Sequence, residues 1–530
     1  MTDRRTSSST WAPLRLAVFR WLWLASLVSN VGTWMQTVGA QWILVHAANA
    51  AILVSLVQTA DMLPDVMFGI VGGVLADTLD RRRLLMAVQG GLVIATSGLA
   101  AVTIAGRISP TLLLMFTFVI GAGSVLVTPA YQSLVPEMVP RDEVASAAQL
   151  SSINVNLARA VGPALAGLLI AHFGVGAVFG IDAATFLFYG VVVALWHPPA
   201  ETTPQIREPF VSALRAGGRY VRYAPVVRRI LFRATLFLVP ASALWALLPL
   251  VANRRLGLGS SGYGLLLAAL GVGAIAGASV LSRVRARLST SALVALAGVV
   301  YGVALVVVIL VRSTVLVVVV LVPAGVAWVG MLATVNTLLQ LFLPRWVRAR
   351  GLSVYQMVLY GAQGFGALCW GLAADAFGLR TTFLAAGALM VLGAASVRFW
   401  PLRDTTHMDR STLVEPDPVV ALEMGNESGP IVVRTTYSVP AEQQLEFIRA
   451  MGRVRQSRLR TGATQWGLYR VGEEPSEFDE IFVVGSWGEH LRQHRERLTA
   501  TDRAFEEAAN AFSKSPPQTW HLLPTDDEEP

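Results

Sequence analysis

Long apolar runs alternate with short polar connections over the first four hundred residues of the chain. A helix needs about 20 mostly apolar residues to cross a bilayer. The pattern predicts twelve such helices, at roughly 19–45, 50–76, 84–105, 111–135, 148–172, 176–196, 227–252, 262–282, 291–311, 314–340, 351–375 and 379–400. An even number of spans leaves both ends of this region on the same side of the membrane.

The pattern changes after Pro401. Residues 402–429 are polar and rich in acidic side chains, which is typical of a linker. The following elements are expected as strand 431–439, helix 441–460, strand 465–471, strand 480–486, helix 488–512 and strand 518–523. The order βαββαβ is that of a ferredoxin-like domain. We therefore expect a soluble α+β module at 430–524 and an acidic tail at 525–530.

Composition supports a membrane protein. Only 14% of the 530 residues are charged, against about 25% in soluble domains. The net charge of +8 does not indicate nucleic-acid binding, because the basic residues cluster in short connections between apolar runs. The sequence predicts no metal site and no cofactor. Its one lysine, Lys514, lacks the glycines of a phosphate-binding loop, which argues against ATP hydrolysis by that route.

Arginines fall mainly on one side of the predicted membrane. The connections on the side of the N-terminus carry Arg81, Arg82, Arg83, Arg207, Arg215, Arg219, Arg222, Arg283, Arg285, Arg287, Arg345, Arg348 and Arg350. The opposite connections carry Arg107, Arg254, Arg255, Arg312 and Arg380. Cytoplasmic loops are the ones enriched in Lys and Arg. The sequence therefore predicts a multi-pass protein of the cell membrane with both termini in the cytoplasm.

The two halves of the helical region repeat each other at an offset of 204 residues. Landmarks that coincide are Gly73 with Gly277, Arg81 with Arg285, Pro140 with Pro344, Gly162 with Gly366, Gly167 with Gly371, and Gly174 with Gly378. A parallel repeat of six helices predicts one site between two halves that rock against each other. The halves would span 1–200 and 226–401, joined by a cytoplasmic segment at 201–225.

A glycine–aspartate–arginine motif connects the second and third predicted helices. It reads Gly73-x-x-x-Asp77-x-x-Asp80-Arg81-Arg82. It resembles the loop signature of the major facilitator superfamily, although Asp80 stands where that signature has glycine. We expect Asp77 to cap a helix or pair with an arginine as part of a gating lock, with the arginines at the lipid headgroups. The alternative is a simple topology signal.

A second motif lies in the fifth helix and reads Arg159-x-x-Gly162-Pro163-x-x-x-Gly167. It resembles the helix-5 signature of exporters in the same superfamily. Proline removes one backbone hydrogen bond and bends a helix, and the glycines permit close packing. The alternative is a kinked, tightly packed helix with no bearing on the direction of transport.

Four charged residues stand inside apolar runs: Asp61, Asp65, Arg159 and Asp182. Charges in a membrane are costly and mark functional sites by default. The rise of a helix places Asp65 and Arg159 at similar depth, so we expect them to be partners that couple a proton to transport. The alternative is a static ion pair that holds helices together.

The first predicted helix carries amide side chains at Asn30, Gln36 and Gln41. Amides at helical spacing could line an aqueous cavity, or they could form hydrogen bonds between helices. The sequence leaves both readings open.

Taken as a whole, the chain resembles the drug- and siderophore-exporting branch of the major facilitator superfamily known as transmembrane secretion effectors. Its C-terminal module resembles antibiotic-biosynthesis monooxygenases, through Trp487-Gly-Glu-His490-Leu-Arg-Gln-His494. The resemblance implies proton-driven export of a hydrophobic or siderophore-like small molecule and self-association through the module, whose relatives are dimeric. The module shows no catalytic pattern clear enough to transfer, so we expect no enzymatic activity. The alternatives are a proton-independent facilitator, and a membrane-tethered ligand-binding protein or enzyme that acts through the module.

Overall fold

The computed structural model describes residues 11–140, 142–196, 210–402, 409 and 411–523. They fall into two compact units. The first lies within Met1–Pro204, Phe232–Thr334 and Gln356–Pro401, and the second within Gln205–Leu231, Val335–Tyr355 and Leu402–Pro530.

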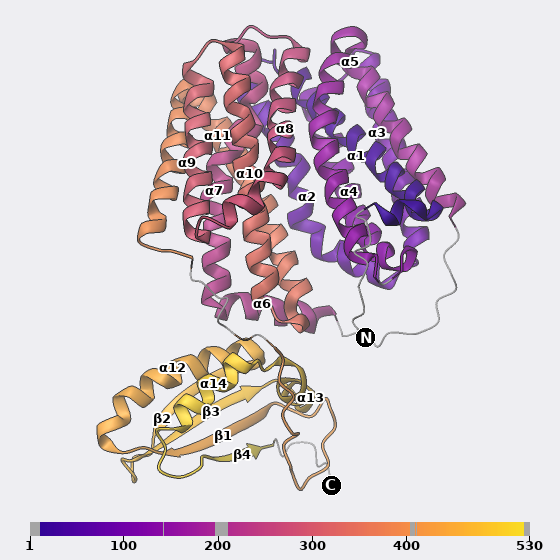
Figure 1. The fold of residues 1–530 in the computed structure, drawn as a ribbon. Helices are drawn as coiled ribbons and strands as arrows, with labels where there is room; N and C mark the ends of the chain where they lie inside the picture. The colour runs from indigo at the N-terminus through magenta and orange to yellow at the C-terminus, as the bar shows by residue number, and fades with distance from the viewer. Residues whose placement is uncertain (1–10, 141, 197–209, 403–408, 410, 524–530) are drawn as a thin grey trace, which may run out of the picture. The chain divides into compact units, whose positions relative to one another are not determined.

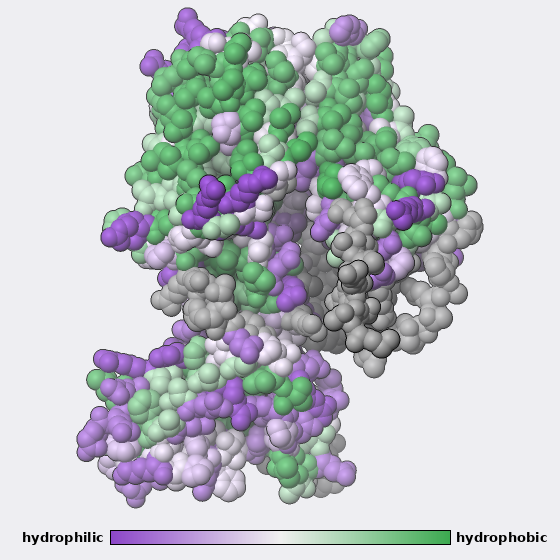
Figure 2. All heavy atoms as spheres, viewed as in Figure 1, coloured by the Kyte–Doolittle hydropathy of each residue, from purple (hydrophilic) through white to green (hydrophobic). Residues whose placement is uncertain are grey.

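The first unit is a bundle of long helices (Figure 1). The helices that lie in it wholly are α1 (Ala17–Ile43), α2 (Ala50–Thr78), α3 (Arg81–Ile104), α4 (Pro110–Met138), α5 (Val144–Leu195), α8 (Ser260–Arg285) and α9 (Thr290–Leu310), and those that lie in it for most of their length are α7 (Pro225–Leu250), α10 (Thr314–Phe342) and α11 (Arg345–Ala395). Figure 2 shows mostly apolar side chains on the visible face of the bundle. Within the described residues, nine helical stretches are long and apolar enough to cross a membrane.

Two of these helices are about twice as long as a bilayer requires. Each is interrupted at one glycine with a left-handed backbone: Gly174 in α5 has φ 77° and ψ 172°, and Gly378 in α11 has φ 79° and ψ 159°. Side chains disfavour this conformation, whereas glycine adopts it freely. The two glycines are a pair in the repeat of 204 residues, so the internal repeat extends to the backbone conformation.

The two halves of the bundle touch through α5 and α8. A Cβ added to Gly167 of α5 would lie 2.6 Å from the carbonyl oxygen of Ser260. A Cβ on Gly264 of α8 would lie 2.6 Å from the carbonyl oxygen of Pro163. The backbones of the two helices therefore meet at a crossing that only glycine permits.

The second unit contains a four-stranded antiparallel sheet of order β2-β3-β1-β4. Its strands are β1 (Ile431–Ser438), β2 (Ala463–Arg470), β3 (Glu477–Val484) and β4 (Gln518–Leu522), and its helices are α12 (Gln444–Thr461), α13 (Trp487–Arg492) and α14 (Ala500–Asn510). The alternation along the chain is the expected βαββαβ. Helices α12 and α14 lie on one face of the sheet (Figure 1). Phe447, Met451 and Val454 of α12 pack there against Tyr437 and Phe478.

The helix expected at 488–512 is instead broken in two. Helix α13 ends at Arg492 and runs into a π-helical turn at Gln493–Arg497. Helix α14 then starts from its own capping box, in which Thr499 and Asp502 bond each other's backbone and side chain. This reciprocal cap satisfies donors at the start of a helix and fixes the new beginning.

The stretch expected to be a linker follows the surface of the module over its described part. The amide of Leu413 donates to the carbonyl of Leu498, and that of Glu415 to the carbonyl of His494. The Asp417 carboxylate accepts from Arg495 at 2.8 Å. The described residues 411–429 are thus held by the module.

A helix that the apolar pattern does not predict, α6 (Phe210–Tyr223), also belongs to the second unit. It packs on α12, where the guanidinium of Arg460 lies 5.6 Å from the ring of Tyr220. Tyr220 in turn meets Trp346, at the start of α11, edge to face at 5.7 Å. Trp346 also carries the guanidinium of Arg497 at 5.0 Å from its ring. The module, α6 and the beginning of α11 therefore share one aromatic junction.

The acid in this junction is Glu489. It accepts hydrogen bonds from Arg497 at 2.5 Å and Arg492 at 2.7 Å, and its carboxylate lies 3.9 Å from Arg219 of α6. Burial alone would raise the pKa of Glu489, but the hydrogen bonds from Arg497 and Arg492 outweigh it and hold the pKa at about 2. The carboxylate is therefore charged at neutral pH and ties α6 to the module.

Candidate transport site and gating elements

The motif between α2 and α3 forms a helix start. Asp80 is the N-cap of α3, and its side chain accepts from the amide of Arg83 at 3.0 Å. An acceptor here satisfies one of the free amides at the helix start, which explains an aspartate at the signature's glycine position. Gly73 and Asp77 lie in the last turns of α2, but the side chain of Asp77 is outside the described residues. The gating-lock role of Asp77 stays a prediction.

Arg82 holds the far end of another helix. Its guanidinium donates to the carbonyl of Val193 at 3.3 Å and to that of Ala194, at the end of α5. Helix ends leave carbonyls without partners, and cations are favourable there. Arg81 begins α3, and its repeat partner Arg285 donates to the hydroxyl of Thr334 in α10 at 3.2 Å. These arginines fasten helices within each half as well as marking topology.

The helix-5 motif packs against both halves. A Cβ on Gly162 would lie 2.6 Å from Cβ of Trp34 in α1. Gly167 meets Ser260 of α8, whose hydroxyl donates to the Gly167 carbonyl at 3.1 Å. Pro163 lies within α5 between the two glycines. The motif is therefore a hub where α5 contacts its own half on one side and the opposite half on the other.

Arg159 stands one turn before this hub. Its guanidinium lies 5.5 Å from the centre of the Trp34 ring, in cation–π geometry. The phenol of Tyr360 in α11 is within electrostatic range of it. Its Nε atom is buried and has no hydrogen-bond partner. Arg159 is thus a buried cation that lies over an aromatic ring and keeps one hydrogen-bond donor unused.

The expected ion pair between Asp65 and Arg159 is wrong for this conformation. Among the described residues, no carboxylate lies within ion-pair distance of the Arg159 guanidinium. Asp65 instead interacts electrostatically with Asp61, on its own helix. The helix packing gives the reason. Helix α2 packs on α4 and, through Thr59, on α11, whereas α5 packs on α1, α3 and α8. Equal depth along two helices does not make them neighbours.

Asp182 lies apart from the other acids. It has no exposed surface, and its Oδ1 accepts from the hydroxyl of Thr185 at 3.3 Å. Its Oδ2 has no partner. A Cβ on Gly32 of α1 would collide with this carboxyl, so glycine there gives the acid its space. Asp182 therefore sits between α1 and the second part of α5, within one half.

The amides of α1 make contacts between helices. Asn30 donates to the side chain of Asn154 in α5 at 2.9 Å. Gln41 accepts from the hydroxyl of Tyr263 in α8 and donates to the carbonyl of Trp245 in α7 at 3.4 Å. Gln36 is 1% exposed, and its amide nitrogen has no partner. In this conformation Asn30 and Gln41 form hydrogen bonds between helices, and their role in lining a cavity stays a prediction.

An aromatic wall that the sequence analysis missed adjoins Arg159. Trp34 lies 5.9 Å from Trp245 of α7, and Trp245 lies 5.4 Å from Trp328 of α10. The indole nitrogen of Trp328 is buried without a hydrogen-bond partner. Tryptophans within apolar runs were the available signal, because a buried indole usually finds an acceptor. The wall that adjoins Arg159 therefore contains an unused donor.

Among the residues that the structure describes, contacts between the halves concentrate at one end of the bundle. We call this the distal end: it carries the connections α1–α2, α3–α4, α7–α8 and α9–α10. There Trp42 stacks on Tyr263 at 6.0 Å, and Thr59 of α2 donates to the carbonyl of Gly364 in α11 at 3.0 Å. The Gly167–Ser260 contact lies toward the same end. The distal end is closed.

No group of three or more metal-ligating side chains occurs among the residues that the structure describes.

Comparison with known protein families covers almost the whole chain. The family model described as transmembrane secretion effector matches residues 8–529, which is nearly the full chain. The chain belongs to the transmembrane secretion effectors. The resemblance to transmembrane secretion effectors is thereby confirmed, and the protein is a multi-pass membrane protein of a transporter family.

Similar curated proteins of this family are exporters and transporters. The staphyloferrin A transporter of Staphylococcus aureus is 21% identical over 365 residues, covering 69% of this chain and 91% of the relative. The multidrug efflux pump Tap of Mycolicibacterium fortuitum is 25% identical, covering 74% of this chain and 97% of the pump. The enterobactin exporter EntS of Shigella boydii is 31% identical, but over only 39% of this chain and 49% of the exporter.

Solved structures show the same helical fold. A bacterial homologue of the human lysosomal transporter Spinster, in an inward-facing and occupied conformation, has a TM-score of 0.60 at 17% identity. The match covers 73% of this chain and 97% of that one. At this identity the match establishes the fold of the bundle alone.

Proposed function

We propose that this transmembrane secretion effector exports a hydrophobic drug-like or siderophore-like small molecule by alternating access, driven by protons. The observation that carries the proposal is Arg159. It is a cation deep in the bundle, flanked by Trp34 and the aromatic wall, with a free donor and with no carboxylate paired to it among the described residues. A charge placed there is costly unless it has a function. An acidic aromatic substrate would satisfy it.

The arrangement of the halves supports alternating access. Hydrogen bonds and ring contacts join them at the distal end, and the glycine crossing of α5 on α8 lies toward that end. Rocking about such a crossing exposes a central site to one side at a time. With both termini in the cytoplasm, as the arginine distribution predicts, this conformation faces inward.

The proton carriers in this proposal are Asp61, Asp65 and Asp182. Asp182 is the sharpest candidate, because its second carboxyl oxygen is buried without a partner. Isolated buried carboxylates are unfavourable, so we propose that a proton resides on it in this conformation. Release of that proton on the other side of the membrane would then accompany rearrangement of α1 against α5.

The finer architecture belongs to the same proposal. Helices α5 and α11 would each supply two spans, one on either side of the left-handed glycine. With α1 counted as a further span, the apolar stretches described above then give twelve. The sheet order β2-β3-β1-β4 is that of a ferredoxin-like module. Its uncovered face carries Tyr469, Trp520 and Leu522, each more than half exposed. We propose self-association of two copies through that face.

Inverted membrane vesicles test the proposal. Substrates from a panel of dyes, antibiotics and siderophores should accumulate when a proton gradient is imposed and leak out when a protonophore is added, without ATP. Asp182→Asn should abolish gradient-driven accumulation while keeping binding, and Asp142→Asn, the same change at an exposed acid just before α5, is the matched control. Accumulation that survives the protonophore would instead identify another energy source, and equilibration without accumulation would identify a facilitator.

A further inference from the structure

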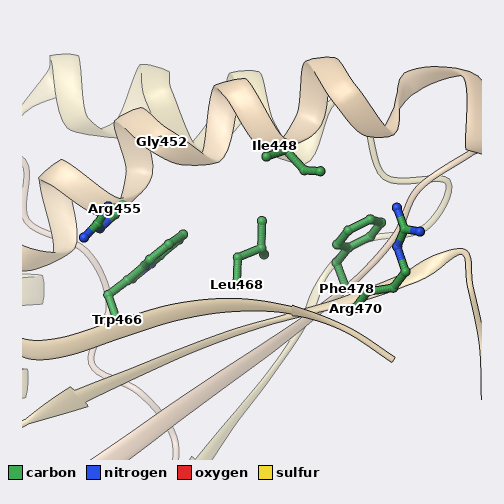
Figure 3. A pocket seen from close by; sticks show the side chains of 7 residues that line it. All are labelled: Ile448, Gly452, Arg455, Trp466, Leu468, Arg470 and Phe478. Atoms are coloured by element: carbon green, nitrogen blue, oxygen red, sulfur yellow. The ribbon is translucent and has the colours of Figure 1, made fainter. Parts of the chain in front are cut away.

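The C-terminal module has an open groove of about 450 Å³ at the β2 edge of its sheet. Figure 3 shows Ile448, Gly452 and Arg455 of α12 above it, and Trp466, Leu468, Arg470 and Phe478 of the strands below. The spacing explains the convergence, because residues four and seven apart share a helix face and alternate strand residues share a sheet face. Its volume lies within the range of small-molecule sites, about 300–1,000 Å³.

The groove has an apolar floor and a guanidinium at each end. Arg455 lies 5.8 Å from the centre of the Trp466 ring, and Arg470 lies 5.2 Å from that of Phe478. Arg470 also donates to the amide oxygen of Gln444 at 2.7 Å. Neither arginine forms an ion pair with a described carboxylate. The groove therefore presents two positive charges that the surrounding chain does not neutralise.

The acid beneath the groove is already satisfied. Glu480 has no exposed surface and accepts from Arg458 at 3.3 Å, from the phenol of Tyr437 at 3.1 Å and from the indole of Trp466 at 2.8 Å. Its charge is matched by Arg458 from inside the core. The hydrogen bond to Trp466 also fixes the plane of the indole ring. A ligand would meet a fixed aromatic surface rather than a mobile one.

Gly452 is the second independent sign of a site. It lies in the interior of α12, where glycine costs about 1 kcal/mol relative to alanine. A Cβ added there would meet no atom within 4 Å. Close packing within the protein therefore does not require glycine at this position. What the missing side chain leaves is space in the roof of the groove.

We propose that this groove binds a small organic acid with a flat aromatic body. The body lies on Trp466, Leu468 and Phe478, and the carboxylate pairs with Arg455 or Arg470, whose planar guanidinium suits bidentate carboxylates. The proposal goes beyond the transport function and does not depend on it, since every residue it uses lies in α12, β2 and β3.

The test uses the full chain in lipid nanodiscs and 6-fluoro-2-naphthoate as the probe, followed by ¹⁹F NMR titration. We expect saturable binding, weakened at least ten-fold in the Arg455→Gln/Arg470→Gln double variant. Arg449→Gln, on an exposed part of α12 outside the groove, is the matched control and should bind like the wild type. Gly452→Leu should abolish binding by filling the groove, while the module becomes no less resistant to unfolding.

Two results would overturn the proposal. One is equal affinity for wild type, the double arginine variant and Gly452→Leu, which would place the probe in the bundle or the lipid. The other is the absence of any saturable site in the wild-type chain. The neutral amide of the same probe separates charge from shape: equal binding of amide and acid would refute the role of the guanidiniums.

Discussion

The glycine crossing between α5 and α8 gives a sharp prediction about conformation. In Gly167→Ala, the new methyl group would lie 2.6 Å from the Ser260 carbonyl oxygen and 3.1 Å from Cα of Gly264. Both neighbours are backbone atoms, so no side chain can swing away to relieve the contact. Overpacking of this kind costs about 1–3 kcal/mol. That cost falls only on conformations in which the distal end is closed.

The expected result is a shift toward conformations in which the halves separate at the distal end. A penalty of about 1–3 kcal/mol changes the ratio of the two populations by about 5- to 150-fold. Spin labels at Arg107 and Arg312, in the α3–α4 and α9–α10 connections, report the distance between the halves by pulsed electron resonance. The chain's one cysteine, Cys369, is first replaced by serine so that only the two labels react.

Gly180→Ala is the matched control, because a Cβ on Gly180 of the same helix α5 meets nothing within 4 Å. It should leave the distance distribution unchanged. If Gly167→Ala also leaves the distribution and the thermal stability unchanged, the backbones do not meet at this crossing and the reasoning about the hub fails.

Two further predictions concern the module. Burial lowers the pKa of His490 to about 3. The stability that this neutral ring contributes is therefore complete above pH 6.5 and is lost as the pH falls toward 3. Between pH 6.5 and 5 the free energy of unfolding should drop by about 2 kcal/mol. Amide hydrogen exchange of β1 measures this drop, and an equal drop in His490→Gln would contradict it. Trp346→Ala removes the ring that meets Tyr220 and Arg497, so exchange in α6 and around Thr461 should rise by a factor corresponding to about 1–3 kcal/mol. Trp346→Phe should keep most of the protection, and unchanged exchange in Trp346→Ala would show that the junction does not stabilise the second unit.

The repeat was the feature of the bundle that the sequence predicted best. The offset of 204 residues pairs Gly174 with Gly378 from the sequence alone, and in the structure both glycines adopt the same left-handed backbone. Such a signal is local, because each glycine's conformation depends on its own turn. The order of strands and helices in the module was predictable for the same reason: alternation and turn residues are read within one element at a time.

The partner of Arg159 could not be predicted in this way. Counting residues along a helix gives depth, but which neighbouring helix a side chain faces depends on how the helices pack. Asp65 has a suitable depth, but its helix α2 packs on α4 and α11. The groups near Arg159 are Trp34 of α1 and Tyr360 of α11. Helix α6 was missed because its apolar face is short and is completed only by residues of α12, far along the chain.

The aromatic junction of the second unit also sets an order of events during synthesis. Tyr220 and Trp346 are translated well before Arg460 and Arg497, the residues that cover them. A nascent chain that has already produced every apolar helix therefore still displays two uncovered rings, 1% exposed in the case of Tyr220 once folding is complete. Burial of these rings is a late step of maturation, and a chain that stalls before Arg497 carries a surface by which chaperones and proteases can tell it from a finished transporter.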